Sequence, residues 1–155
     1  MRPSARGIAC FTLVLALALS LDLRGAGEQV TVYKTPACGC CKMWVEHLKK
    51  NGFQVTAHDV PSTAPYRQKY GVPDSLQSCH TAVVGNYVIE GHVPATEIKR
   101  ILKELPAAKG LAVPGMPLGS PGMEASKPSR RDAYSVVLVG LSGKTSVYRA
   151  YAASE

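Results

Sequence analysis

The feature that most constrains the fold is a strand, a cysteine-rich loop, a helix and a second strand in close succession. Residues 29–33, Gln-Val-Thr-Val-Tyr, are β-branched and aromatic and predict a buried strand. The apolar spacing of residues 40–51 predicts a helix that ends before Gly52, and the alternation in residues 53–60 predicts another strand. Two strands joined through a helix pair in parallel, so we expect a compact β-α-β unit.

Further elements follow this unit. Gly85-Asn86 separates two short apolar segments and is typical of a hairpin turn, and Pro94 marks a helix start. The predicted elements are a short helix at 65–70, strands at 81–84 and 87–90, and a helix at 95–105. The order β-α-β-α-β-β-α resembles the thioredoxin fold, and we therefore expect an α/β, thioredoxin-like domain over residues 28–106.

The last third of the chain has a different composition. Residues 110–124 contain four glycines and three prolines, which predicts a loop without regular structure. Residues 134–139 and 145–151 predict a second hairpin. Because an isolated hairpin is only marginally stable, we expect residues 107–155 to form an extension packed on the same domain.

The first residues read as a targeting segment. Arg2 and Arg6 precede an uncharged apolar run over residues 8–21, and small residues follow up to Gly27. Asp22 closes the run before the roughly 20 apolar residues that a membrane span needs. Residues 1–27 are therefore predicted to be a cleaved signal peptide, and the mature protein to be exported without a permanent membrane anchor.

The charge of the chain excludes one class of partner. The formal net charge is +7, and removing Arg2, Arg6, Arg24 and Asp22 with the signal leaves +5. The lysines and arginines are scattered, without the aromatic interleaving that single-stranded nucleic acid requires. We expect a solvated basic surface and no nucleic-acid partner.

Three cysteines mark the candidate site. Cys38, Cys40 and Cys41 directly follow a predicted strand and open a predicted helix. The amide groups and dipole of a helix N-terminus stabilise thiolates, which prepares these side chains as nucleophiles or as metal ligands. A structural disulfide to Cys79 is the alternative, but such a bridge does not require three cysteines in four residues.

Cys79-His80 strengthens the metal hypothesis. The pair lies just before the third predicted strand, where proteins with a thioredoxin-like fold normally have a cis proline facing the C-x-x-C motif. A thiol and an imidazole occupy that place here. This departure weakens a role in disulfide exchange and favours a metal site.

Methionines in the glycine- and proline-rich loop indicate which metal. Met116 and Met123 lie in no apolar pattern that would bury them. Thiolates and thioethers together select the soft ion copper(I), although methionine also serves as a simple gap filler in cores.

The remaining candidates are weaker. His47 shares a helix face with Cys40 and Met43, and His92 lies at a strand-to-helix junction, so either could turn towards the cluster. We expect Met43 and Trp44 to belong to the core because of their helical spacing, and His58 to be exposed.

Four stretches carry a family resemblance: residues 33–42, 78–84, 87–95 and 110–124. Through them the sequence resembles the CopG-like exported copper-tolerance proteins of Gram-negative bacteria. The resemblance implies a periplasmic protein that binds several copper ions, contributes to copper resistance and converts copper between oxidation states. The ligands it implies are Cys38, Cys40, Cys41 and Cys79, with His80, Met116 and Met123.

Three functions remain open from the sequence. The first is a binding module that holds copper(I) in a cysteine-bridged cluster, either sequestering it or passing it to an exporter or another periplasmic copper protein. The second is a thiol-disulfide oxidoreductase with Cys38 as nucleophile and Cys41 as resolving thiol. The third is a zinc-binding structural module.

Overall fold

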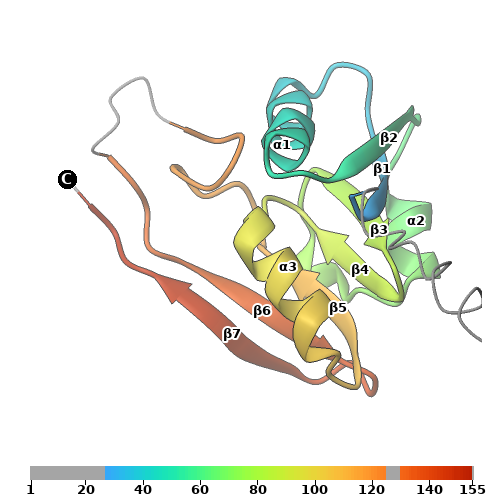
Figure 1. Cartoon of the computed structure of the whole chain (residues 1–155), viewed down its shortest axis with the longest axis vertical. Helices are drawn as coiled ribbons and strands as arrows, with labels where there is room; N and C mark the ends of the chain where they lie inside the picture. The colour runs from blue at the N-terminus through green and yellow to red at the C-terminus, as the bar shows by residue number, and fades with distance from the viewer. Residues whose placement is uncertain (1–26, 125–129, 155) are drawn as a thin grey trace, which may run out of the picture.

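The computed structural model describes residues 27–124 and 130–154 (Figure 1). Within these residues the strands form one sheet, in the order β2-β1-β3-β4-β5-β6-β7. The mixed α/β class is therefore confirmed. Apart from Gly27, the predicted signal segment lies outside the described residues, as does Cys10. The helices of the described part are each too short or too polar to cross a bilayer.

The elements match most of the predicted segments within one or two residues. The strands are β1 (Gln29–Lys34), β2 (Gln54–Asp59), β3 (His80–Val84), β4 (Tyr87–Glu90), β5 (Ala108–Ala112), β6 (Tyr134–Gly140) and β7 (Thr145–Tyr151). The helices are α1 (Gly39–Lys50), α2 (Ala64–Lys69), α3 (Ala95–Glu104) and the 3-10 turn η1 (Asp74–Leu76).

The β-α-β unit forms as predicted, since β1 and β2 pair in parallel with α1 between them. Two hydrophobic clusters then sandwich the sheet. The larger joins α1 and α3 to one face, where Trp44, Leu48 and Ile98 are fully buried. The smaller covers Val88 and Val139 with residues around η1 on the other face. Neighbouring residues of β4 therefore serve opposite cores, as the pleat of a strand requires.

Strand β5 corrects the prediction that residues from 110 onwards form no regular structure. It pairs in parallel with β4 and antiparallel with β6, so it lies inside the sheet. Within this strand, position 110 needs a glycine because the backbone of β4 approaches it closely. An added Cβ would lie 1.7 Å from the carbonyl oxygen of Val88. A glycine that suggested a loop in fact permits close strand packing.

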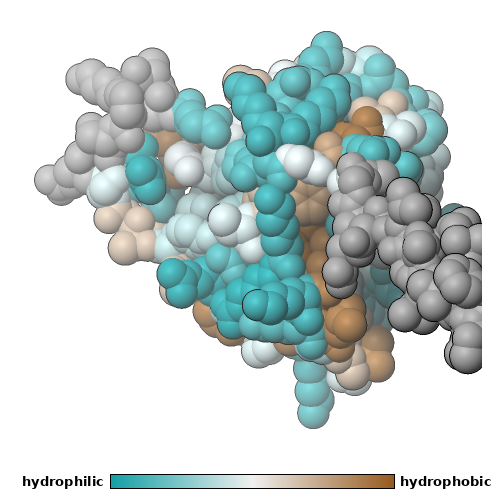
Figure 2. All heavy atoms as spheres, in the orientation of Figure 1, coloured by the Kyte–Doolittle hydropathy of each residue, from teal (hydrophilic) through white to brown (hydrophobic). Residues whose placement is uncertain are grey.

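The hairpin of β6 and β7 extends the same sheet through β5, along the lower edge of Figure 1. Tyr134 and Tyr151 stack across the pair, and the Tyr151 hydroxyl donates to a carboxylate oxygen of Glu97 on α3, at 3.0 Å. Figure 2 shows mainly hydrophilic side chains over α1 and α3 on this face.

Candidate metal centre

The first turn of α1 presents the three clustered cysteines. Cys38 is the N-cap of the helix, and its sulfur accepts a hydrogen bond from the backbone amide of Cys41, at 3.3 Å. Cys41 is fully buried, whereas Cys38 and Cys40 are partly exposed. Cys38 and Cys41 are joined by a disulfide, while Cys40 and Cys79 are free thiols.

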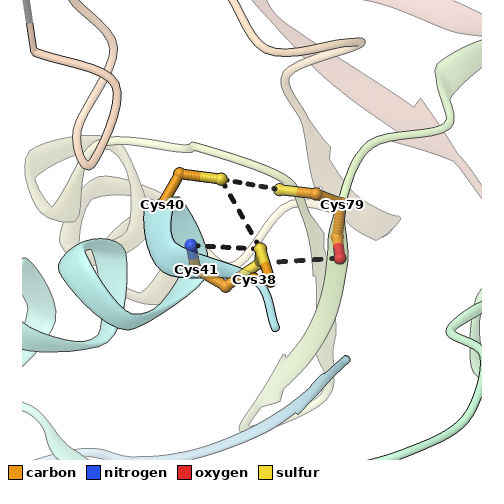
Figure 3. A group of neighbouring side chains, drawn as sticks. All are labelled: Cys38, Cys40, Cys41 and Cys79. Carbon is orange, nitrogen blue, oxygen red and sulfur yellow. Dashed lines mark hydrogen bonds between the residues drawn. A yellow bond between two sulfur atoms is a disulfide. The ribbon is translucent and has the colours of Figure 1, made fainter. Parts of the chain in front are cut away.

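Cys79 faces the helix from the start of β3 (Figure 3). Its sulfur lies 3.9 Å from that of Cys40, and the Cys40 sulfur lies 3.5 Å from that of Cys38. All four sulfur atoms, including that of Cys41, lie within 4.8 Å of one another. Cys79, which follows α1, β2 and α2 in the chain, thus meets the cysteines at the start of α1.

Two imidazoles extend this cluster on the side of Cys79. The sulfur of Cys79 lies 3.0 Å from Nε2 of His92 and 3.4 Å from Nδ1 of His80. Both rings are fully buried, and their ligand atoms and the sulfur lie within 4.8 Å of one another. In the described part of the chain, Cys79 is therefore shared by a four-sulfur group and a group of one sulfur and two nitrogens.

The ring of His92 is oriented by the glycine- and proline-rich loop. Its Nδ1 lies 2.8 Å from the carbonyl oxygen of Pro121. A carbonyl can only accept, so Nδ1 carries the proton and Nε2 presents a lone pair towards Cys79. A metal-ligating histidine is commonly fixed in this way through its second nitrogen.

Two hydrogen bonds from α1 fix the backbone that follows His92. The indole nitrogen of Trp44 donates to the carbonyl of Val93 at 2.9 Å, and the amide of Ala95 donates to Nε2 of His47 at 3.1 Å. His47 therefore satisfies a free amide at the start of α3 with the nitrogen that it could otherwise offer to a metal. Sequence reasoning placed His92 no higher than His47 because neither contact can be read from spacing.

Glu90 fixes the segment that carries Cys79 and His80. The fully buried carboxylate accepts from the amide of Ser78 at 2.9 Å and from the hydroxyl of Thr81 at 2.7 Å. Burial raises the pKa of Glu90, and these two hydrogen bonds oppose that rise. Sequence reasoning missed this residue, since a glutamate at a strand end is ordinarily solvated.

Burial keeps the side chains of Cys79, His80 and His92 neutral when no metal is bound. It raises the pKa of Cys79 to about 12, with the neighbouring Cys40 adding to the rise. It lowers the pKa of His80 to about 3 and that of His92 below its usual range. The thiolate-stabilising effect of the helix terminus does not extend to Cys79, so a metal must displace the proton of that thiol.

His80 contains the least satisfied atom of the centre. Its Nε2 is buried without a hydrogen-bond partner among the described residues, and its ring lies 4.3 Å from that of Trp44. An unpaired buried polar atom costs about 1–3 kcal/mol in folding free energy. Such an atom beside a thiol and a second imidazole fits a site whose ligand set is completed by a metal.

Comparison with known proteins agrees with this chemistry. Two solved structures, described as copper resistance protein CopG, form 2 and form 1, are each 46% identical to this sequence. Form 2 matches with a TM-score of 0.76, and the match covers 81% of this chain and 98% of that chain. Form 1 matches with a TM-score of 0.75, and the match covers 80% of this chain and 97% of that chain. The chain belongs to the CopG family of copper resistance proteins. A family described as "Protein of unknown function, DUF411" also matches residues 76–123. The sequence matches no curated protein.

In this member of the CopG family, the glycine- and proline-rich loop that carries Met116 and Met123 lies directly against α1, the helix that carries the cysteines. Gly122 is so close to α1 that an added Cβ would lie 2.6 Å from the carbonyl oxygen of Cys40. Met123 is therefore one residue from that contact. At the other end of the loop, Gly115 accepts from the hydroxyl of Ser78, next to Cys79, and Met116 follows with 55% of its surface exposed.

A glycine substitution tests whether this contact stabilises the centre. We expect Gly122→Ala to lower the free energy of unfolding by about 2–4 kcal/mol, because its φ of +83° disfavours a side chain and the new methyl group meets α1. Gly115→Ala is the matched control, since its φ is +69° but an added Cβ meets nothing within 4 Å. Urea denaturation of the metal-free protein measures both, and equal losses would mean that the loop does not bear on the helix.

The other sequence predictions have mixed outcomes. Trp44 belongs to the core and His58 is exposed, as predicted. The prediction for Met43 is wrong: 52% of its surface is exposed. Met43 lies on the α1 face that carries Cys40 and His47, beside the buried stripe of Cys41, Trp44, Val45 and Leu48.

Proposed function

We propose that this protein binds copper(I) as cargo in a cluster bridged by Cys38, Cys40, Cys41 and Cys79, and so contributes to copper resistance. The observation that carries the proposal is the convergence of four sulfur atoms within 4.8 Å of one another. Sulfur ligands favour copper(I) over zinc or magnesium. Thiolates packed this closely cannot each serve a separate ion, so they would bridge several.

The outer ligands of the proposed cluster are His80, Met116 and Met123, to which the geometry adds His92. Nε2 of His92 is closer to the Cys79 sulfur than Nδ1 of His80 is, at 3.0 Å against 3.4 Å. Its protonated Nδ1 is already held by Pro121, which supports a role as ligand.

The disulfide between Cys38 and Cys41 places a condition on this function. Two electrons and two protons convert it to two thiols, and those thiols lose their protons when they bind metal. Among the described residues, Cys40 and Cys79 are the two that offer thiols in the disulfide form. We propose that the reduced protein is the copper-binding form. We also propose that the centre can convert copper between its oxidation states: closing the Cys38–Cys41 disulfide releases two protons and two electrons, and the electrons convert two copper(II) ions to two copper(I) ions.

The setting of this function follows the sequence predictions. We propose an exported protein of the periplasm whose residues 28–106 form a thioredoxin-like domain and whose residues 107–155 extend it. Copper would pass from it to an exporter or to another copper protein of that compartment. The similarity to copper resistance proteins supports a role in copper handling, and the periplasmic location rests on the predicted signal segment.

Elemental analysis tests the proposal. Protein purified without oxygen from copper-supplemented cells is expected to retain more than one copper per chain, and Cys40→Ser to retain fewer, because it removes one bridging sulfur. His58→Gln is the control, as this exposed imidazole lies outside both ligand groups. An unchanged copper content in Cys40→Ser would rule out the cluster.

Thiol-disulfide exchange is the second candidate, and the Cys38–Cys41 disulfide favours it. An oxidoreductase would reduce insulin in the presence of a thiol reductant, and Cys38→Ser would abolish that activity. Competition between copper(I) and zinc for the reduced protein tests the third candidate, a zinc-binding structural module. Zinc should prevail only if the site is a structural zinc site.

A further inference from the structure

Met43 occupies a position that neither core packing nor the proposed cluster explains. The two hydrophobic clusters of the described residues contain no methionine, and the Met43 side chain is 52% exposed. Met43 follows Cys40 by three residues and precedes His47 by four. Residues at these spacings are neighbours on a helix surface, with Cβ atoms about 5–6 Å apart.

A cavity of about 380 Å³ opens at this part of α1. Its lining residues are Lys42, Met43, Glu46, His47, Lys50 and Glu124. Glu124 is held in the cavity wall by its carboxylate, which accepts from the amide of Gly122 at 3.0 Å. Because Gly122 lies against the carbonyl of Cys40, the cavity borders the turn of α1 that carries the cluster.

The cavity suits a soft monovalent cation. Its two carboxylates balance its two ammonium groups, so an arriving cation meets no net repulsion. Nε2 of His47 is occupied by the amide of Ala95, which leaves the thioether of Met43 as the soft donor of the wall. A neutral thioether needs no deprotonation before it binds copper(I), unlike the cysteine thiols of the reduced cluster.

We propose that Met43 and this cavity form an entry site at which copper(I) binds before it reaches Cys40. The inference rests on the proposed copper-binding function. Transfer occurs by ligand exchange without a change of oxidation state: the bond from copper to the Met43 sulfur breaks as the bond to the Cys40 sulfur forms, and the thiol proton passes to solvent.

Stopped-flow transfer of copper(I) from a coloured copper(I) chelate to the reduced mature protein tests the entry site. Met43→Leu keeps an apolar side chain of similar size but lacks sulfur, so we expect copper transfer several-fold slower than in the wild type with the same final copper content. Met43→His supplies another donor and should recover part of the rate. Val147→Ala, which shortens an exposed side chain on β7, should leave the rate unchanged.

The possible results separate this inference from the proposed function. Equal rates for the wild type and Met43→Leu would overturn the entry site while leaving the cluster intact. A lower final copper content in Met43→Leu would also overturn it, because Met43 would then be a permanent ligand. A wild-type protein that takes up no copper(I) at all would contradict the proposed function itself.

Discussion

Replacing Cys79 by serine is expected to remove most of the bound copper and to weaken what remains by at least about 100-fold, beyond the 10–100-fold typical of losing an outer-shell partner. Cys79 is the residue common to the four-sulfur group and the group with His80 and His92 within the described residues. Its loss takes a bridging sulfur from the first group and the only sulfur from the second. Elemental analysis and competition with a copper(I) chelator measure the two effects.

The order of the variants provides the control. Cys40→Ser should lose less copper than Cys79→Ser, because Cys40 belongs to one group only. His92→Gln should retain the four sulfurs and show the smallest loss of the three. If Cys79→Ser and His92→Gln lose the same amount, the two groups do not share Cys79 as a metal ligand.

Acid should destabilise the reduced, metal-free protein well above the pH at which carboxylates titrate. Burial lowers the pKa of His80 to about 3, and it also lowers the pKa values of His92 and His47. In the unfolded chain these imidazoles bind protons near pH 6.5, whereas in the folded protein they stay neutral to lower pH. The free energy of unfolding therefore falls as the pH drops below 6.5 and towards the folded pKa. For His80 alone, the unfolding free energy should fall by about 2 kcal/mol between pH 7 and 5.

Urea denaturation across this pH range, in the presence of a chelator, measures the effect. His80→Phe keeps an aromatic ring beside Trp44 but cannot take up a proton, so its stability should depend less on pH. His58→Asn, at an exposed position of β2, should keep the wild-type dependence. A wild-type stability that is constant from pH 7 to 5 would contradict the neutral, buried state of His80.

Local sequence patterns were sufficient for most elements and for the sulfur cluster. The cysteine helix, the two hairpins and α3 each have a period or a turn signal within a few residues. The metal hypothesis followed from the same locality, because three of the four sulfurs belong to one helical turn. Cys79 could be assigned to the same site because Cys79-His80 occupies the place where thioredoxin-like proteins normally have a cis proline.

Features decided by distant contacts could not be predicted in this way. Strand β5 has an alanine- and glycine-rich sequence, and pairing on both sides makes it a strand. His92 is distinguished from His47 by Pro121 and Cys79, which lie far from it in sequence. Met43 was assigned to the core from its helical spacing, yet its face of α1 borders a cavity in place of packed side chains.

The hydrogen bond between His92 and Pro121 has a consequence for how the protein matures. The loop that orients His92 lies in the last third of the chain, far in sequence from the cysteines of α1. Until Pro121 arrives, that imidazole has no partner to fix which nitrogen carries its proton, and the thiols are available to whatever ion or oxidant is present. Docking of this loop therefore completes the centre, and an ion that binds a chain without the docked loop would meet the sulfurs beside an imidazole that Pro121 does not orient.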